Sequence, residues 1–179
     1  MTLNDNVNVE GQLFLEGSGS GVTFADGTTQ TTAVTSSWHQ ILSANERFEL
    51  VMPVVAGPIT VYHAVLDHET GLVWQRYTSD TTYTWNEAQA NCYMLYCGTR
   101  LGWRLPTVDE LATLIDRSQT EPSLPQEHPF TNVQSSFYWS ITTGGGYEDG
   151  AWGVDFSDGN AGYANTVNTG YVRAVRSGQ

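Results

Sequence analysis

The chain has 179 residues, of which 7 are basic and 19 acidic, and its net charge of −12 repels phosphate backbones and anionic lipid alike. We therefore expect neither nucleic-acid binding nor membrane insertion, and no run approaches the ~20 apolar residues of a membrane span. The length suits one packed domain with a short appendage. Abundant Gly, Ser, Thr and Asn with sparse charge indicate a loop-rich, mostly β protein with an extracellular type of surface.

The amino terminus lacks the basic and apolar regions of a secretory signal. Since the surface composition is nevertheless of an extracellular type, we expect assembly in the cytoplasm and release as part of a virion or another extracellular particle. A chain without its natural leader would look the same. All seven basic residues are arginines, which suit bidentate pairing with carboxylates, so we expect several to form ion pairs within the fold.

Residues 5–16 alternate between apolar and polar side chains, which predicts a strand that is too short to close a core alone and must pair elsewhere. A glycine- and serine-rich link follows at residues 17–21. After it, Asp26 and Gly27 predict a tight turn.

Residues 21–33 read Gly-Val-Thr-Phe-Ala-Asp-Gly-Thr-Thr-Gln-Thr-Thr-Ala. This stretch resembles a recurrent segment of phage tail-fibre and collar proteins, which commonly lies in trimeric shafts. The resemblance implies that residues 1–36 form a short β-type fibre or oligomerisation segment, that the protein is a homotrimer, and that its partners include other tail or appendage proteins. A flexible linker rich in Thr and Gly is the alternative interpretation.

From residue 37 onward, aromatic and aliphatic residues are dense enough for a core, so we predict one domain over residues 37–179. Its first predicted strands are 48–52, 59–66 and 71–76. Later strands are predicted at 137–142, 151–156, 162–166 and 171–176, with glycine-rich turns between them. Strands, then two helices, then more strands indicate an α+β fold with a mainly antiparallel sheet.

The two short helices are predicted from capping boxes, Thr84 with Glu87 and Thr107 with Glu110. In a capping box the Thr hydroxyl accepts a backbone N–H three residues on, and the Glu carboxylate reaches back. Apolar residues recur behind each box at helical spacing: Trp85, Ala88, Cys92 and Leu95, then Val108, Leu111, Leu114 and Ile115. We expect both helices to pack on a sheet.

Cys92 and Cys97 are the only cysteines. Within one helix, their separation would hold the Cα atoms beyond the ~7 Å that a disulfide allows, so a bridge requires the helix to end between them. Two buried, unbridged thiols are the preferred interpretation over a disulfide.

Blocks spread over two thirds of the chain resemble the Lcl C-terminal domain family, typified by the carboxy-terminal domain of a collagen-like bacterial adhesin. They are residues 64–74, the Gly-Trp-Arg-Leu-Pro-Thr block 102–107 with Glu110 and Leu111, and residues 128–130, 138–140, 151–156 and 172–176. The resemblance implies a C-type-lectin-like fold, shared with formylglycine-generating enzymes, in which the termini lie close together and variable loops present a binding surface.

The most recognisable residues of these blocks are expected to hold the fold, because large aromatics dominate the cores of small domains. They are Trp74, Trp103, Arg104, Pro106, Glu110, Trp139, Trp152 and Arg173. We expect Arg104 to be a partly buried partner of a carboxylate or carbonyl. Binding residues are instead expected in the irregular stretches between the blocks.

The richest such stretch, residues 147–171, combines Tyr and Asn, which give stacking and hydrogen bonds at small entropy cost. We predict that its polar and aromatic side chains bind a cell-surface glycan or protein. The predicted ligand-binding residues are Tyr147, Asp149, Asp158, Asn160, Tyr163, Asn165 and Asn168.

No catalytic residue is predicted, because formylglycine-generating enzymes depend on a cysteine late in the domain and none follows Cys97. We expect no cofactor and no metal, since the Glu-Pro-Asn, Gln-Pro-Asp and Trp-Asn-Asp triplets of calcium-dependent lectins are absent. The alternative is a calcium ion held by oxygen ligands from Glu148, Asp149, Asp155 and Asp158.

The sequence therefore predicts a non-enzymatic receptor-binding protein at the tip of a phage or phage-like tail fibre. A second hypothesis is a structural subunit of an extracellular appendage or filament that donates its amino-terminal strand to a neighbour. An enzyme of the formylglycine-generating type comes third.

Overall fold

The computed structural model describes residues 22–23, 29–30, 42–144 and 149–178. The chain divides into two compact units, residues 1–39 and 40–179. In the first unit, strand β1 (Val22–Thr23) pairs antiparallel with β2 (Thr29–Gln30), and Val22 lies opposite Gln30. The strand predicted within residues 5–16 lies outside the described residues, as does the predicted turn at Asp26 and Gly27.

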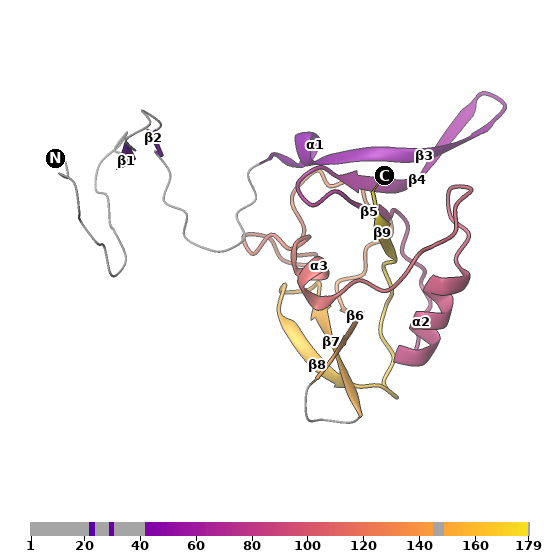
Figure 1. Ribbon diagram of the computed structural model, residues 1–179, viewed down its shortest axis with the longest axis vertical. Coiled ribbons are helices and arrows are strands. Elements are labelled where there is room, and N and C mark those ends of the chain that lie inside the picture. Colours follow the sequence, from indigo (N-terminus) through magenta and orange to yellow (C-terminus); the bar gives the residue numbers. More distant parts are fainter. Residues whose placement is uncertain (1–21, 24–28, 31–41, 145–148, 179) are drawn as a thin grey trace. The chain divides into compact units, whose positions relative to one another are not determined.

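The second unit opens with a short helix, α1 (Ala44–Arg47), and a four-stranded antiparallel sheet. We call this the first sheet; its order is β3 (Phe48–Ala56), β4 (Ile59–Asp67), β5 (Leu72–Gln75) and β9 (Val175–Ser177). Gly57 takes a φ of 61° in the two-residue turn between β3 and β4, a conformation that favours glycine. The first and last strands of the unit thus lie in one sheet, and the β3–β4 hairpin projects beyond it (Figure 1).

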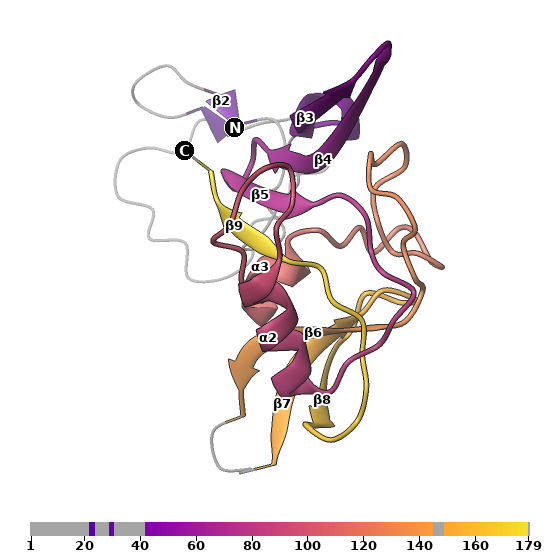
Figure 2. The ribbon, with the colours of Figure 1, turned by 90° about the vertical axis from the view of Figure 1, so that its right-hand side faces the viewer.

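The second sheet has the order β6 (Phe137–Thr143), β7 (Gly150–Asp155) and β8 (Ala161–Asn165), and it is also antiparallel. Helix α2 (Trp85–Met94) lies at one side of this sheet, as Figures 1 and 2 both show. Helix α3 (Val108–Ala112) contacts β6 and β7. Two antiparallel sheets with few helices confirm the predicted α+β class, and no described helix is long and apolar enough to cross a membrane.

Both predicted capping boxes are present. The backbone N–H of Thr84 donates to Glu87 at 2.9 Å, and that of Thr107 donates to Glu110 at 2.8 Å. The predicted carboxy-terminal ends of the two helices were wrong, since α2 stops before Leu95 and α3 stops before Leu114. Leu114 remains fully buried, because the chain turns there and still packs it into the core.

The core has two clusters, one on each face of the first sheet. Because successive side chains of a strand point to opposite faces, Trp74 packs in one cluster and Val73 in the other. Trp103 and Trp139 are buried in the cluster that contains Val73. These three tryptophans therefore have the structural role that the family resemblance implied.

The last predicted strand was wrong, since β9 begins only at Val175 and residues 171–174 form no strand. The reason is that this segment passes between the sheets. Tyr171 exchanges hydrogen bonds with the backbone around Phe137 and Trp139 in β6, whereas the carbonyl of Ala174 accepts from Gln75 in β5. One chain segment therefore ties the second sheet to the first.

Three of the seven arginines, including the predicted Arg104 and Arg173, contact different groups within the fold. Arg47 is fully buried and pairs with the carboxylate of Asp67, with Nη2 2.6 Å from Oδ2 and Nε 2.9 Å from Oδ1. Arg104 forms a two-pronged pair with Glu110 at 2.7 and 2.8 Å, as expected for a carboxylate partner. Arg173 is buried but donates to the Gln75 carbonyl at 2.9 Å and to other uncharged oxygens.

Cys92 and Cys97 are both buried and both free, so the disulfide alternative is not realised. Helix α2 does end between them, at Met94, which removes the helical obstacle to a bridge. Burial raises the pKa of the Cys92 thiol to about 12 and also raises that of Cys97. Both side chains thus serve as neutral packing groups at neutral pH.

Candidate functional site

The side chain of Trp152 faces solvent, which corrects its predicted place in the core. Its exposed fraction is 36%, whereas its neighbour Ala151 in β7 is completely buried. Alternation along the strand explains the difference, because Ala151 and Trp152 point to opposite faces of the second sheet. Trp152 belongs to one of the blocks that resemble the Lcl C-terminal domain family, yet at this position its side chain is exposed.

Tyr163 of β8 lies directly opposite Trp152 in the strand register. Residues paired in this way share one face of a sheet. The two rings meet edge to face, with centroids 5.8 Å apart and planes at 72°, and Tyr163 is 38% exposed. Trp152 and Tyr163 therefore form one surface, which we call the aromatic surface.

Two glycines allow the Tyr163 ring to lie close to the backbone. A Cβ atom built at Gly150 or at Gly144 would collide with this ring. Gly150 is the first residue of β7, and Gly144 directly follows β6. The ring of Tyr163 thus leans over backbone that carries no side chain, which fixes its orientation on the sheet.

Three predicted ligand-binding residues lie near one end of the β7–β8 pair. Asn165 is opposite Gly150 in the register, and the backbone N–H of Thr166 donates to the Asp149 carbonyl at 2.8 Å. The backbone N–H of Asn168 donates to the Asn165 carbonyl at 2.9 Å. Within the described part of the chain, the carboxylate of Asp149 makes no hydrogen bond, so it is available to a ligand.

Asp158 and Asn160 lie at the opposite end, in the turn between β7 and β8. Asn160 Nδ2 donates to Asp158 Oδ2 at 2.7 Å, and Arg117 Nη1 donates to Asn160 Oδ1 at 3.3 Å. Hydrogen bonds from Asn160 hold the pKa of the Asp158 carboxyl below its ordinary value. These two side chains are already occupied with the turn and with Arg117.

The predicted binding set is therefore divided rather than gathered at one place. The length of β7 separates Asp149 from Asp158, and Tyr163 lies between the two groups. Tyr147 lies outside the described residues. The surface position of Trp152 was not predicted. No local signal in the sequence marks it, because Val154, two residues along the same face of β7, is fully buried.

The alternative calcium cluster is divided in the same way. Asp149 precedes β7 and Asp155 ends it, and Asp155 Oδ1 accepts hydrogen bonds from the backbone N–H and the hydroxyl of Ser157 at 2.8 and 2.6 Å. Glu148 is not among the described residues. Across residues 42–144 and 149–178, no three His, Cys, Asp or Glu side chains are grouped as metal ligands would be.

A model of the Lcl C-terminal domain family matches residues 63–176. The matched span covers more than half of the 179 residues and contains α2, α3, the whole second sheet and β5. Both rings of the aromatic surface lie within it. No curated protein matches the chain.

Proposed function

The chain belongs to the Lcl C-terminal domain family, and on that premise we propose that it is a non-enzymatic recognition module that binds a cell-surface glycan or protein. The family is one of extracellular or adhesion-type domains of bacteria and phages. We assign binding to the aromatic surface, with Asp149, Asn165 and Asn168 supplying polar contacts at its edge.

The exposure of Trp152 beside Tyr163 carries this proposal. Both are residue types that dominate the energetics of protein interfaces, because a large rigid ring gives contact area at a small cost in entropy. Trp152 is not among the buried residues of either core cluster. An exposed indole beside a tyrosine ring, with carboxylate and amide groups at its edge, suits a sugar ring or a protein surface better than an enclosed small molecule.

We further propose that the domain has the C-type-lectin-like arrangement. In its support, helices α2 and α3 accompany two antiparallel sheets, and the first and last strands of the unit lie in one sheet. The proposal concerns shape alone. Separately, we propose that the domain binds its ligand without calcium and without catalysis, so saturating EDTA should leave ligand binding unchanged.

For the particle, we propose a phage or phage-like tail-fibre tip that is trimeric through residues 1–36. The support is the segment 21–33 and the pairing of β1 with β2. Three linked copies would convert a weak site into a firm attachment, because the second and third contacts become intramolecular. The proposal includes assembly in the cytoplasm and release with the virion.

Deleting residues 1–36 should turn the trimer into a monomer in light scattering, and an unchanged trimer would refute the oligomer assignment.

The binding proposal is tested by mutation of the aromatic surface in the full chain. Trp152→Ala and Tyr163→Ala should each weaken binding to whole cells or to a glycan array by about thirtyfold, the loss typical of an interface hot spot of about 2 kcal/mol. Tyr93→Ala is the matched control, since this ring is 81% exposed and lies on α2. If all three variants bind like the wild type, the aromatic surface is not the site.

A further inference from the structure

The seven arginines differ in what their guanidinium groups contact. Five of them donate hydrogen bonds to carboxylate, carbonyl or amide oxygens: Arg47, Arg76, Arg104, Arg117 and Arg173. The other two are Arg100 and Arg176, whose guanidinium groups make no hydrogen bond or ion pair with any residue that the structure describes. Arg100 is exposed and Arg176 is half-buried, so both guanidinium groups can reach a ligand from solvent.

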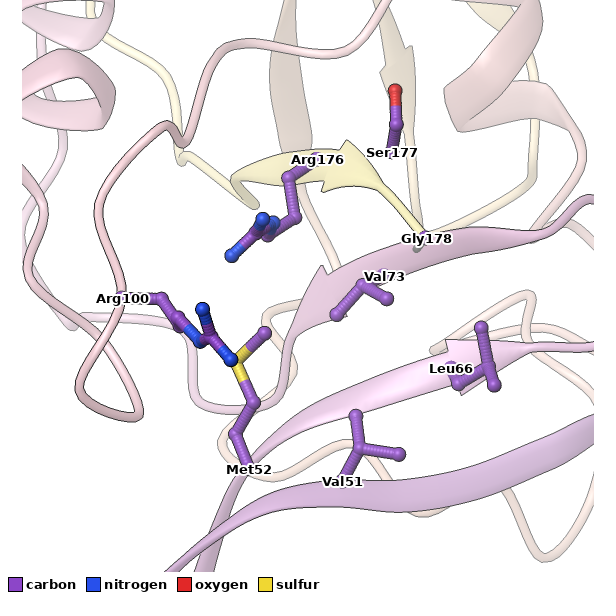
Figure 3. Close-up of a pocket in the computed structure, with 8 residues that line it drawn as sticks. All are labelled: Val51, Met52, Leu66, Val73, Arg100, Arg176, Ser177 and Gly178. Atoms are coloured by element: carbon purple, nitrogen blue, oxygen red, sulfur yellow. The ribbon is translucent and has the colours of Figure 1, made fainter.

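Arg100 and Arg176 line the same pocket, which we call the arginine pocket (Figure 3). Its volume is about 170 Å³. Its walls are Val51, Met52, Leu66, Val73, Arg100, Arg176, Ser177 and Gly178. Figure 3 shows the Arg100 side chain reaching in from the loop after α2 and the Arg176 side chain reaching in from β9.

The strand register builds the pocket on one face of the first sheet. Leu66 is opposite Val73, and Val73 is opposite Arg176, so these three side chains form a row across β4, β5 and β9. The loop after α2 brings Arg100 over the row, and two backbone hydrogen bonds of 3.1 Å between Cys97 and Arg100 fix that loop. The result is an apolar floor with two cations at its edge.

We propose that the arginine pocket binds a small carboxylate, with the acid group between the guanidinium groups of Arg100 and Arg176 and a short apolar body on the floor. Guanidinium groups present paired N–H donors that match the two oxygens of a carboxylate. Two like charges that face one pocket repel each other, and a bound anion removes that repulsion.

The apolar floor of the arginine pocket favours an aliphatic carboxylate over inorganic phosphate. Inorganic phosphate is hydrated on all sides and would leave Val51, Leu66 and Val73 uncovered, whereas an aliphatic acid covers them. The volume is below the ~300 Å³ at which pockets for larger ligands begin, so the apolar body must be short. The pocket lies on the first sheet and the aromatic surface on the second, so this site does not depend on the proposed function.

Titration with sodium butyrate, followed by 1H–15N correlation spectra of the full chain at low salt, tests the proposal. We expect saturable shifts at the backbone amides of Val73, Arg176 and Gly178. Arg100→Gln and Arg176→Gln should each weaken binding by about fivefold, the effect of losing one partly exposed ion pair. Arg117→Gln is the matched control and should bind butyrate like the wild type.

Two comparators decide between this site and simpler explanations. 1-Butanol has a matching apolar body without the charge, and equal shifts with it would show an apolar groove and overturn the proposal. Inorganic phosphate at the same concentration should compete weakly, and tighter binding of phosphate would overturn the choice of a carboxylate. Absence of saturable shifts in the wild type, or unchanged binding in both glutamine variants, would refute the site itself.

Discussion

The guanidinium of Arg173 lies over the ring of Phe130, with its Cζ 4.5 Å from the ring centroid, and both residues are buried. Arg173 forms no ion pair with any described residue. It donates instead to the carbonyls of Gln75 and Arg76 at 2.9 and 3.2 Å and to the hydroxyl of Thr78 at 2.7 Å. The cation thus joins the segment after β5 to the segment before β9.

Replacing Arg173 should destabilise the domain. Arg173→Met keeps an apolar side chain of similar reach, but the Gln75 carbonyl loses the guanidinium donor and Thr78 Oγ1 keeps only a long 3.5 Å bond from Tyr138. We therefore expect a loss of about 2–4 kcal/mol in the free energy of unfolding. Urea denaturation measures it. Arg117→Met, at an exposed position, should stay within about 0.5 kcal/mol of the wild type. Equal stability of Arg173→Met and the wild type would show that the buried cation gives no net stabilisation.

The ion pair between Arg104 and Glu110 predicts an acid-dependent loss of stability. Burial raises the pKa of Glu110, but hydrogen bonds from Arg104 and Thr107 outweigh that effect and hold it below the ordinary value of 4.5. A carboxyl whose pKa is lower in the folded state stabilises the fold above its unfolded pKa, and this contribution disappears as the pH falls through the folded pKa.

The test compares the melting temperatures of Glu110→Gln and the wild type in thermal denaturation between about pH 3 and 7. Above about pH 5 the variant should melt at a constant interval below the wild type, and below about pH 4 the interval should shrink. Asp109→Asn is a control on the same helix, because Asp109 is exposed. An interval that does not change with pH would contradict the assignment.

How far the sequence predicted this fold depends on how local each signal was. The capping boxes at Thr84 and Thr107 are complete within four residues, and both helices begin where predicted. The exposure of Trp152 depends on which end of the sheet stays uncovered, which involves distant segments that no local pattern describes. The same holds for the pocket, because Arg100 and Arg176 meet only through tertiary packing.

We expect the two free thiols to react very slowly with thiol reagents in the native protein. Burial raises the pKa of Cys92 to about 12, so almost none of it is thiolate at neutral pH. With an aromatic disulfide reagent, the native chain should show negligible labelling over minutes, and the chain in urea should release two equivalents. Rapid labelling of the native chain would revive the third hypothesis, an enzyme that uses a cysteine, and Cys92→Ala and Cys97→Ala would then identify the thiol.

Gly150 should control the orientation of Tyr163 on the aromatic surface. The Cβ of Gly150→Ala would overlap the Tyr163 ring, so the ring must move, and overpacking of this kind costs about 1–3 kcal/mol. Gly162→Ala is the matched control, because its Cβ would meet only Phe137 at 3.7 Å, an ordinary contact. A double-mutant cycle isolates the effect: in a Tyr163→Ala background, Gly150→Ala should cost much less stability than it does alone. Additive losses would mean that the two positions do not interact, and the ring would then owe its orientation to Trp152 and not to the glycine beneath it.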